Sequence, residues 1–183
     1  MSSKIETPVI ALGTFDGLHP GHRAVLKECL ALAREKQVPS MVYTFIENPR
    51  SLFGQKPRAL MSPEEKTRAM LDIGITRVEA VHFTRELSEL EPAQFVDMLA
   101  KAYSPSAFVC GADYSFGRRA TGTGETLKRL AEERGIETRI VPLVHIRGSG
   151  DAQAEKISST LIRKALDDGD IQTAERLLKG DAG

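Results

Sequence analysis

Residues 8–22, PVIALGTFDGLHPGH, contain an apolar run, a turn bounded by glycine and the start of an amphipathic segment. Pro8 to Leu12 is apolar throughout and is followed by Gly13, which predicts a strand buried on both faces. Gly21 to Lys36 has apolar side chains at helical spacing, which predicts a helix. A buried strand that leads through a short turn into a helix is the repeating unit of an α/β fold.

The rest of the chain continues this alternation and has no internal repeat or low-complexity segment. Further strands are predicted at residues 40–45, 77–83, 107–110 and 138–144. Further helices are predicted from Ser62 to Gly74 and at 92–103, 123–134, 158–167 and 171–178. Residues 46–60 are predicted to form a loop, and Gly148 to Asp151 the most flexible connection. The doubly apolar strands predict a parallel sheet with helices on both faces.

The composition limits the class of protein. The chain of 183 residues has 25 basic and 25 acidic side chains and 41% hydrophobic residues, which is typical of one compact domain. The charge balance argues against broad nucleic-acid binding. We expect a cytoplasmic protein without membrane contact, because no apolar run could span a bilayer and the N-terminus resembles no signal peptide. Cys29 and Cys110 are predicted to be small buried side chains. The sequence pattern does not indicate whether the chain forms oligomers.

The segment from Gly13 to His22 is the first candidate for chemistry, because parallel sheets bind ligands beyond the carboxyl ends of their strands. The N-terminus of the predicted helix offers free N–H groups and a positive dipole end, which suit phosphate. His19 and His22 can donate to phosphoryl oxygens, and Gly21 between them allows a close approach of the backbone. The alternatives are a plain capped helix with a surface histidine, or a weak metal-binding pair.

Two further segments are predicted at the same edge. Residues 157–163, ISSTLIR, place hydroxyl groups at a helix N-terminus and Arg163 about one turn inside the helix, which could hold an anion or be a plain N-cap. Residues 110–119, CGADYSFGRR, place aromatic side chains and two arginines after a strand. Those aromatic side chains could stack on a planar ring, or pack inward and leave the arginines in solvent.

Together these segments resemble the adenylyltransferase module of bacterial FAD synthetases, which belongs to the His-x-Gly-His nucleotidyltransferase superfamily. The matching stretches are GTFDGLHPGH at 13–22, TFIENP at 44–49, CGADYSFG at 110–117 and ISSTLIR at 157–163. The resemblance implies a Rossmann-like nucleotidyltransferase fold, as one domain over residues 1–183. It also implies transfer of the adenylyl group of ATP to FMN, giving FAD and pyrophosphate, with Mg²⁺ carried by ATP.

The resemblance also implies roles for individual residues. Catalytic roles fall to His19, His22 and Arg163. ATP-binding roles fall to Gly13, Phe15, Asp16, Gly21, Gly111, Ser159 and Thr160. Flavin-binding roles fall to Asn48, Phe53, Asp113 and Phe116. No protein ligand to the metal is implied.

The chain departs from the family pattern at three points. Glu47-Asn48-Pro49 stands where the family commonly has Pro-His-Pro, so Asn48 can donate a hydrogen bond but carries no imidazolium charge. Glu47 could repel the phosphate of FMN or pair with a nearby arginine. Ala112 replaces a residue that is often polar. Many relatives continue into a riboflavin kinase domain, whereas this chain stops at Gly183, so we expect no phosphorylation of riboflavin from it.

The departures leave two other functions open. One is adenylyl or cytidylyl transfer to a different phosphorylated small molecule. The other is a regulatory protein that binds flavin or nucleotide without catalysis. His19, His22 and Arg163 argue against the second alternative, and Asn48 argues for it.

Overall fold

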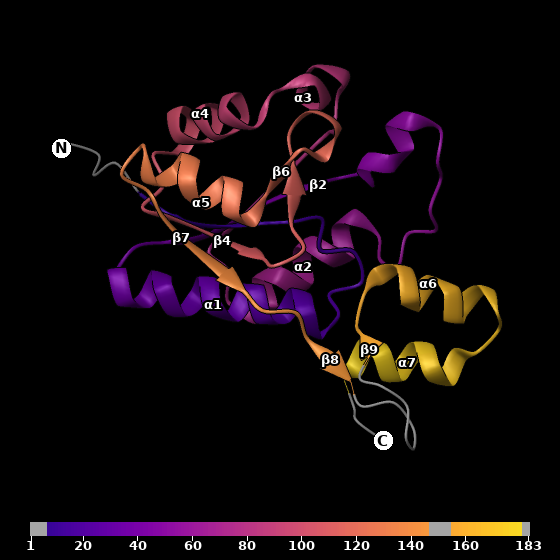
Figure 1. Ribbon diagram of the computed structural model, residues 1–183. Coiled ribbons are helices and arrows are strands. Elements are labelled where there is room, and N and C mark those ends of the chain that lie inside the picture. Colours follow the sequence, from indigo (N-terminus) through magenta and orange to yellow (C-terminus); the bar gives the residue numbers. More distant parts are fainter. Residues whose placement is uncertain (1–6, 147–154, 181–183) are drawn as a thin grey trace.

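The computed structural model describes residues 7–146 and 155–180 (Figure 1). Its centre is a five-stranded sheet in the order β3–β2–β1–β4–β7, in which every neighbouring pair is parallel. The strands are β1 (Val9–Leu12), β2 (Ser40–Phe45), β3 (Arg77–Val81), β4 (Ala107–Gly111) and β7 (Glu137–Val141). The predicted parallel sheet is thereby confirmed. The connection at 148–151, predicted to be flexible, lies outside the described residues.

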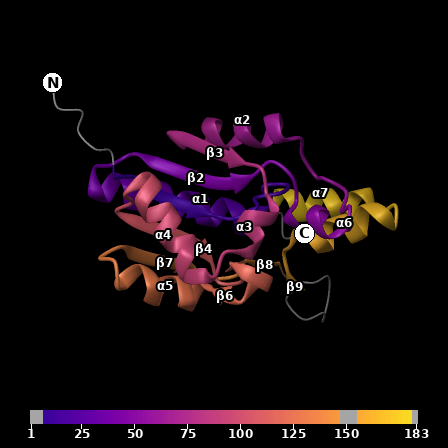
Figure 2. The same cartoon turned by 90° about the horizontal axis from the view of Figure 1, so that it is seen from above.

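Helices cover both faces of this sheet, as Figure 2 shows from above. The covering helices are α1 (Pro20–Lys36), α2 (Pro63–Ile73), α4 (Pro92–Tyr103) and α5 (Gly124–Glu132). One core contains Leu26 of α1 and Met70 of α2, and the other contains Leu99 of α4 and Leu127 of α5. Alternate residues of the central strand enter these two cores, because successive side chains of a strand point to opposite faces. The doubly apolar pattern that predicted a covered sheet is explained by this arrangement.

The capping signal at Ser62 places α2 as the sequence predicts. The Ser62 hydroxyl accepts from the backbone N–H of Glu65 at 3.1 Å, and the Glu65 carboxylate accepts from the Ser62 N–H at 2.8 Å. This reciprocal pair satisfies two donors that the helix itself leaves free. The helix ends at Gly74, whose φ of 110° is open to glycine and strained for other residues.

The structure differs from the expectation mainly in its short elements. The helix α3 (Arg85–Glu89) was not predicted, and the 46–60 loop contains a 3₁₀ helix, η1 (Pro49–Phe53). The predicted strand ending at residue 144 stops at Val141, because Pro142 has no N–H to continue the ladder. Further short elements lie between the main ones along the chain: β5 (Ser115–Phe116), η2 (Arg118–Ala120), β6 (Gly122–Thr123), β8 (His145–Ile146) and β9 (Glu155–Lys156).

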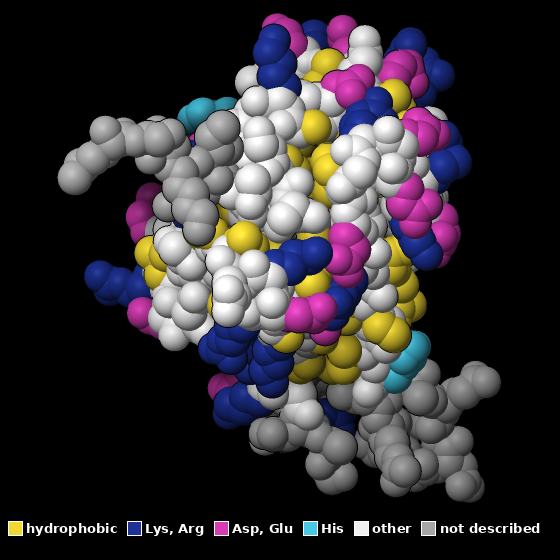
Figure 3. All heavy atoms as spheres, turned by 90° about the vertical axis from the view of Figure 1, so that its left-hand side faces the viewer, with side chains coloured by type: hydrophobic (Ala, Val, Ile, Leu, Met, Phe, Trp, Pro, Cys, Tyr) yellow, Lys and Arg dark blue, Asp and Glu magenta, His cyan; other side chains and the backbone are white. Residues whose placement is uncertain are grey.

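The last two helices, α6 (Ser159–Asp167) and α7 (Ile171–Lys179), lie beside the carboxyl ends of the strands, at the right of Figure 1. They have a separate apolar cluster, which includes Ile162 and Leu177. Figure 3 shows the opposite end of the molecule, where the strands begin and where acidic and basic side chains are interspersed. No helix within the described ranges is both long and apolar enough to cross a bilayer. The expectation of one domain stays a prediction.

Candidate active site

The loop between β1 and α1 has an unusual backbone. Phe15, Gly17 and Leu18 all have positive φ, at 52°, 81° and 42°. Such angles are unfavourable for residues other than glycine, so Phe15 and Leu18 each cost about 1 kcal/mol or more. Burial offsets this strain, because Phe15 and Leu18 are only 1% and 3% exposed. At Gly17 a Cβ atom would lie 2.7 Å from Cδ1 of Leu60, so this position has no room for a side chain.

Two histidines stand at the end of this loop, at the N-terminus of α1. His19 is the N-cap residue, and the rings of His19 and His22 stack with centroids 3.7 Å apart. A Cβ atom on Gly21 would lie 3.1 Å from the His19 ring, so the tight turn favours glycine there. Both Nδ1 atoms are buried and have no hydrogen-bond partner among the described residues. The first turn of α1 therefore presents polar ring atoms without protein partners.

Burial keeps both imidazoles neutral. Burial lowers the pKa of His19 to about 4, although the Asp113 carboxylate nearby acts in the opposite direction. Burial also lowers the pKa of His22 well below its usual value, and the neighbouring His19 and the Lys66 ammonium lower this pKa further. Near pH 7 the two rings are hydrogen-bond donors and acceptors without charge.

Arg163 is held by the loop after β1. Its guanidinium donates to the Asp16 carboxylate and, through Nε, to the carbonyl oxygen of Arg58 at 2.7 Å. The other oxygen of Asp16 accepts from the backbone N–H of Leu60 at 3.0 Å. The Ser159 hydroxyl donates to the carbonyl oxygen of Asp16 at 2.8 Å. Asp16 thus joins the motif loop, the 58–60 segment and α6, and Arg163 is already paired before any ligand binds.

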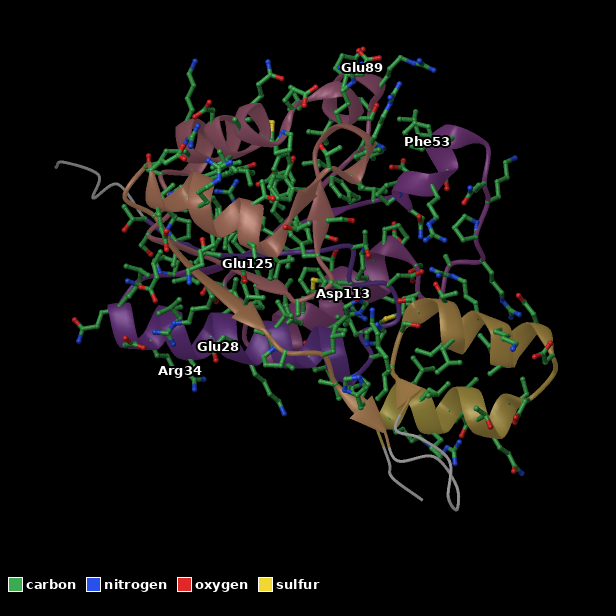
Figure 4. All side chains as sticks on the ribbon, viewed as in Figure 1. Glu28, Arg34, Phe53, Glu89, Asp113 and Glu125 are labelled. Atoms are coloured by element: carbon green, nitrogen blue, oxygen red, sulfur yellow. The ribbon has the colours of Figure 1, made fainter. Side chains whose placement is uncertain are left out.

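Aromatic side chains occupy the other part of the site. Phe116 is 6% exposed and packs between Tyr114 and Phe95, with ring centroids 5.5 Å and 5.4 Å away. It is therefore mainly a core residue, as the inward-packing alternative expected. Phe53 on η1 is 69% exposed, and Figure 4 shows it well apart from Asp113, which lies between the sheet and α6.

The altered second motif has two separate roles. The Asn48 side chain accepts from the backbone N–H of Arg50 at 3.0 Å and caps η1. Glu47 pairs with His82, whose Nδ1 lies 2.6 Å from its carboxylate, instead of with an arginine. Of the two possibilities open for Glu47, pairing with an arginine is not what the structure shows, because β3 brings His82 next to the end of β2.

One cavity of about 680 Å³ connects these groups at the carboxyl ends of the strands. Every residue to which a site role was assigned lines it: Gly13, Phe15, Asp16, His19, Gly21, His22, Asn48, Phe53, Gly111, Asp113, Phe116, Ser159, Thr160 and Arg163. The structure therefore brings together segments that lie far apart in the sequence.

The cavity also contains cationic residues that sequence reasoning missed. Lys156 lines it and forms an ion pair with Asp113 at 2.6 Å. Arg50 lines it as well, and so does Arg119, one of the two arginines of the segment at 110–119 that the sequence had already singled out. The position of Lys156, directly before the ISSTLIR segment at a strand-to-helix junction, was the available signal.

The described residues include no group of three histidine, cysteine, aspartate or glutamate side chains placed to hold a metal ion. The Asp16 and Asp113 carboxylates at the cavity already have cationic partners, Arg163 and Lys156. The donor set around the cavity is thus richer in cations and N–H groups than in metal ligands, and suits an anionic ligand.

Comparison with known proteins identifies relatives along most of the chain. The family model for FAD synthetase matches residues 1–161. Two curated relatives, from Listeria monocytogenes and Bacillus subtilis, are both described as a bifunctional riboflavin kinase/FMN adenylyltransferase. They are 36% and 32% identical to this chain over 173 residues, which is 93% of this chain and 53% and 52% of theirs. This chain therefore spans about half the length of these two relatives.

A solved structure has the same fold. It is described as a macrolide-efflux protein from Streptococcus pneumoniae and matches with a TM-score of 0.80 and 31% sequence identity. The match covers 97% of this chain and 56% of that one.

Proposed function

This chain belongs to the FAD synthetase family, and from that membership we propose that it transfers the adenylyl group of ATP to the phosphate of FMN. The products are FAD and pyrophosphate. ATP and FMN are then its small-molecule partners. Membership is established by the match over residues 1–161, whereas the activity of this chain is the proposal.

One observation carries the proposal: the histidine pair at the N-terminus of α1 lines the same cavity as Ser159 and Arg163, which lie at the N-terminus of α6 and one turn inside it. Helix N-termini attract phosphate through free N–H groups and the helix dipole. A cavity between two of them suits a polyphosphate that contacts both. The aromatic and apolar lining contributed by Phe53, Phe116 and Leu143 gives a planar ring system a place beyond the phosphates.

The proposed step is an in-line displacement. A phosphate oxygen of FMN forms a bond to the α-phosphorus of ATP, and the bond from that phosphorus to the bridging oxygen of pyrophosphate breaks. Such reactions depend mainly on alignment and on stabilisation of the charge that develops. The neutral rings of His19 and His22 donate hydrogen bonds to that charge. Arg163, oriented by Asp16, contacts the leaving group from α6.

We propose that Mg²⁺ enters with ATP and is held largely by phosphate oxygens, as is usual at nucleotide sites. When bound it neutralises phosphate charge. The Asp16 and Asp113 carboxylates support this assignment, because each is already paired with a cation of the protein.

The direct test is incubation of the chain with ATP, Mg²⁺ and FMN, followed by chromatographic separation of the flavins. The expected result is FAD with release of one pyrophosphate for each FAD. Binding of ATP and FMN without any FAD would contradict the proposal and favour the non-catalytic alternative.

A second candidate is nucleotidyl transfer to a different phosphorylated acceptor. It is favoured by the 2.6 Å pair of Glu47 and His82 and by the cap that Asn48 forms, where the family commonly has Pro-His-Pro. A pyrophosphate-release screen with ATP or CTP and a panel of phosphorylated small molecules separates the two. A faster reaction with an acceptor other than FMN would support this second function.

A further inference from the structure

Lys66 of α2 is a buried cation beneath the loop that follows β1. Only 6% of its surface is exposed, and sequence reasoning gave it no role. Its ammonium donates to the carbonyl oxygen of Phe45 at 2.6 Å and to that of Thr14 at 3.2 Å. Both partners are carbonyl groups. A lysine that is buried without a carboxylate partner is disfavoured by desolvation, so its presence calls for a functional explanation.

The first turn of α2 fixes the direction of this side chain. The capping box at Ser62 orders the helix start, and the backbone N–H of Lys66 donates to the Ser62 carbonyl oxygen at 2.9 Å. The side chain therefore extends from an ordered turn to the ends of β1 and β2. The two carbonyl groups that it joins belong to neighbouring strand ends.

The Thr14 carbonyl is held by two donors. The Thr44 hydroxyl, on a side chain with no exposed surface, donates to it at 3.1 Å in addition to Lys66. In a trans peptide the C=O and the following N–H point in opposite directions. The N–H of Phe15 therefore points away from Lys66, and Thr14 and Phe15 both line the cavity.

We propose that Lys66 is a positioning residue for the polyphosphate: it fixes the Thr14–Phe15 peptide so that the Phe15 N–H faces the ligand, and it puts a buried positive charge behind that N–H. The inference rests on the proposed function only in taking the ligand to be a nucleoside triphosphate.

The electrostatic surroundings agree with this role. Burial lowers the pKa of the Lys66 ammonium, while the Asp16 and Glu47 carboxylates raise it. The same charge opposes protonation of His22, which is faced also by His19. A bound phosphate would therefore meet a positive potential from Lys66 and neutral donors from the two imidazoles.

The test compares four variants by ATP calorimetry and by the NMR shift of the Phe15 amide, both without FMN. Lys66→Met removes charge and donors, and Lys66→Arg restores the charge. Thr44→Val removes only the second donor, and Lys27→Met removes an exposed lysine of α1 as a control. Lys66→Met should weaken ATP binding about tenfold or more, because it removes the positive charge together with the hydrogen bond that holds the Thr14 carbonyl group. The ATP-induced shift of the Phe15 amide should also be lost.

Lys66→Arg should recover part of the affinity, Thr44→Val should weaken binding a few-fold, and Lys27→Met should match the wild type. A folded Lys66→Met protein with wild-type ATP affinity, or with the Phe15 shift retained, would overturn the inference. If Lys66→Met does not fold, unchanged ATP binding by Thr44→Val overturns it instead. Because neither readout uses FMN, failure to make FAD leaves this test intact.

Discussion

At the scale of single residues, the site combines strain and desolvation. Phe15 and Leu18 have a left-handed backbone, and the Nδ1 atoms of His19 and His22 are buried without a hydrogen-bond partner among the described residues. Each feature raises the free energy of the protein without a ligand, and such features are concentrated at functional sites. A phosphate bound as proposed would give the two stacked rings hydrogen-bond partners and would so relieve an unfavourable state.

His22→Ala should lower turnover by a factor of about a hundred or more, because it removes a donor to the charge developing on phosphate. The measurement is pyrophosphate release at saturating ATP and FMN. The exposed His145, outside the cavity lining, provides the matched control variant His145→Ala, which should keep wild-type turnover. Full turnover of His22→Ala would show that this imidazole has no role in the step.

Acid should destabilise the protein through His19. Its pKa is about 4 in the folded state and 6.5 as an ordinary value, so the unfolded chain binds more protons between these limits. The contribution is fully present above pH 6.5 and is lost as the pH falls toward 4, up to about 3 kcal/mol. Urea unfolding of the wild type and of His19→Gln at pH 7 and pH 4.5 measures it. The variant should lose less stability on acidification, and parallel losses would contradict the assignment.

At the scale of elements, α6 and α7 form a unit fastened to the sheet by polar contacts. Their apolar cluster is separate from the two large cores, and Asp16 provides two links to α6, through Arg163 and Ser159. The Arg163 and Asp16 side chains are only 13% and 14% exposed, so their ion pair is largely protected from solvent. Removing one partner of such a pair strongly destabilises the protein, because the other charge stays buried without compensation.

Asp16→Asn should therefore loosen α6 while leaving the sheet ordered. Breaking a buried charge pair costs about 3–5 kcal/mol, which should speed hydrogen exchange of α6 amides by tenfold or more. Asp167→Asn, an exposed change at the end of the same helix, is the control. Hydrogen exchange followed by mass spectrometry compares α6 with β1. Equal protection of α6 in both variants would mean that the ion pair does not fasten the helix.

At the scale of the whole molecule, two apolar layers share one central sheet. Leu26 and Leu99 are both fully buried, on opposite faces of it. The strands between them contribute to both layers, so loss of either layer exposes the same backbone. The two layers are expected to unfold together.

Leu26→Ala and Leu99→Ala should each lower the free energy of unfolding by about 2–5 kcal/mol, from lost burial and the cavity left behind. The double variant should show nearly additive loss in one cooperative transition, since the two sites share no contact. Urea unfolding followed by circular dichroism and by tyrosine fluorescence checks this. Two separated transitions would indicate that the layers unfold independently.

Long elements could be predicted from the sequence because their signals are local. The apolar run at 9–12 and the capping box at Ser62 needed no tertiary information. The two-residue strands β5 and β8 are too short for any periodicity to reveal. Lys66 follows two glutamates on a helix and resembles a solvent-exposed residue, so only the packed structure reveals its burial.

The candidate site was predictable where neighbouring residues carried the chemistry, as in His-Pro-Gly-His. Contacts across the chain were not. Asp16 and Arg163 are 147 positions apart, and no local pattern links them. The same holds for Glu47 and His82, which meet because β2 and β3 are adjacent in the sheet.

The backbone at Phe15 and Leu18 has a consequence for redesign. The shape of the loop after β1 depends on two apolar anchors in an unfavourable conformation, so changing either would move His19 and His22 without altering those residues themselves. Libraries meant to broaden acceptor choice should keep these anchors and vary Phe53 and Arg119, whose exposed side chains line the cavity and can be exchanged with little loss of stability.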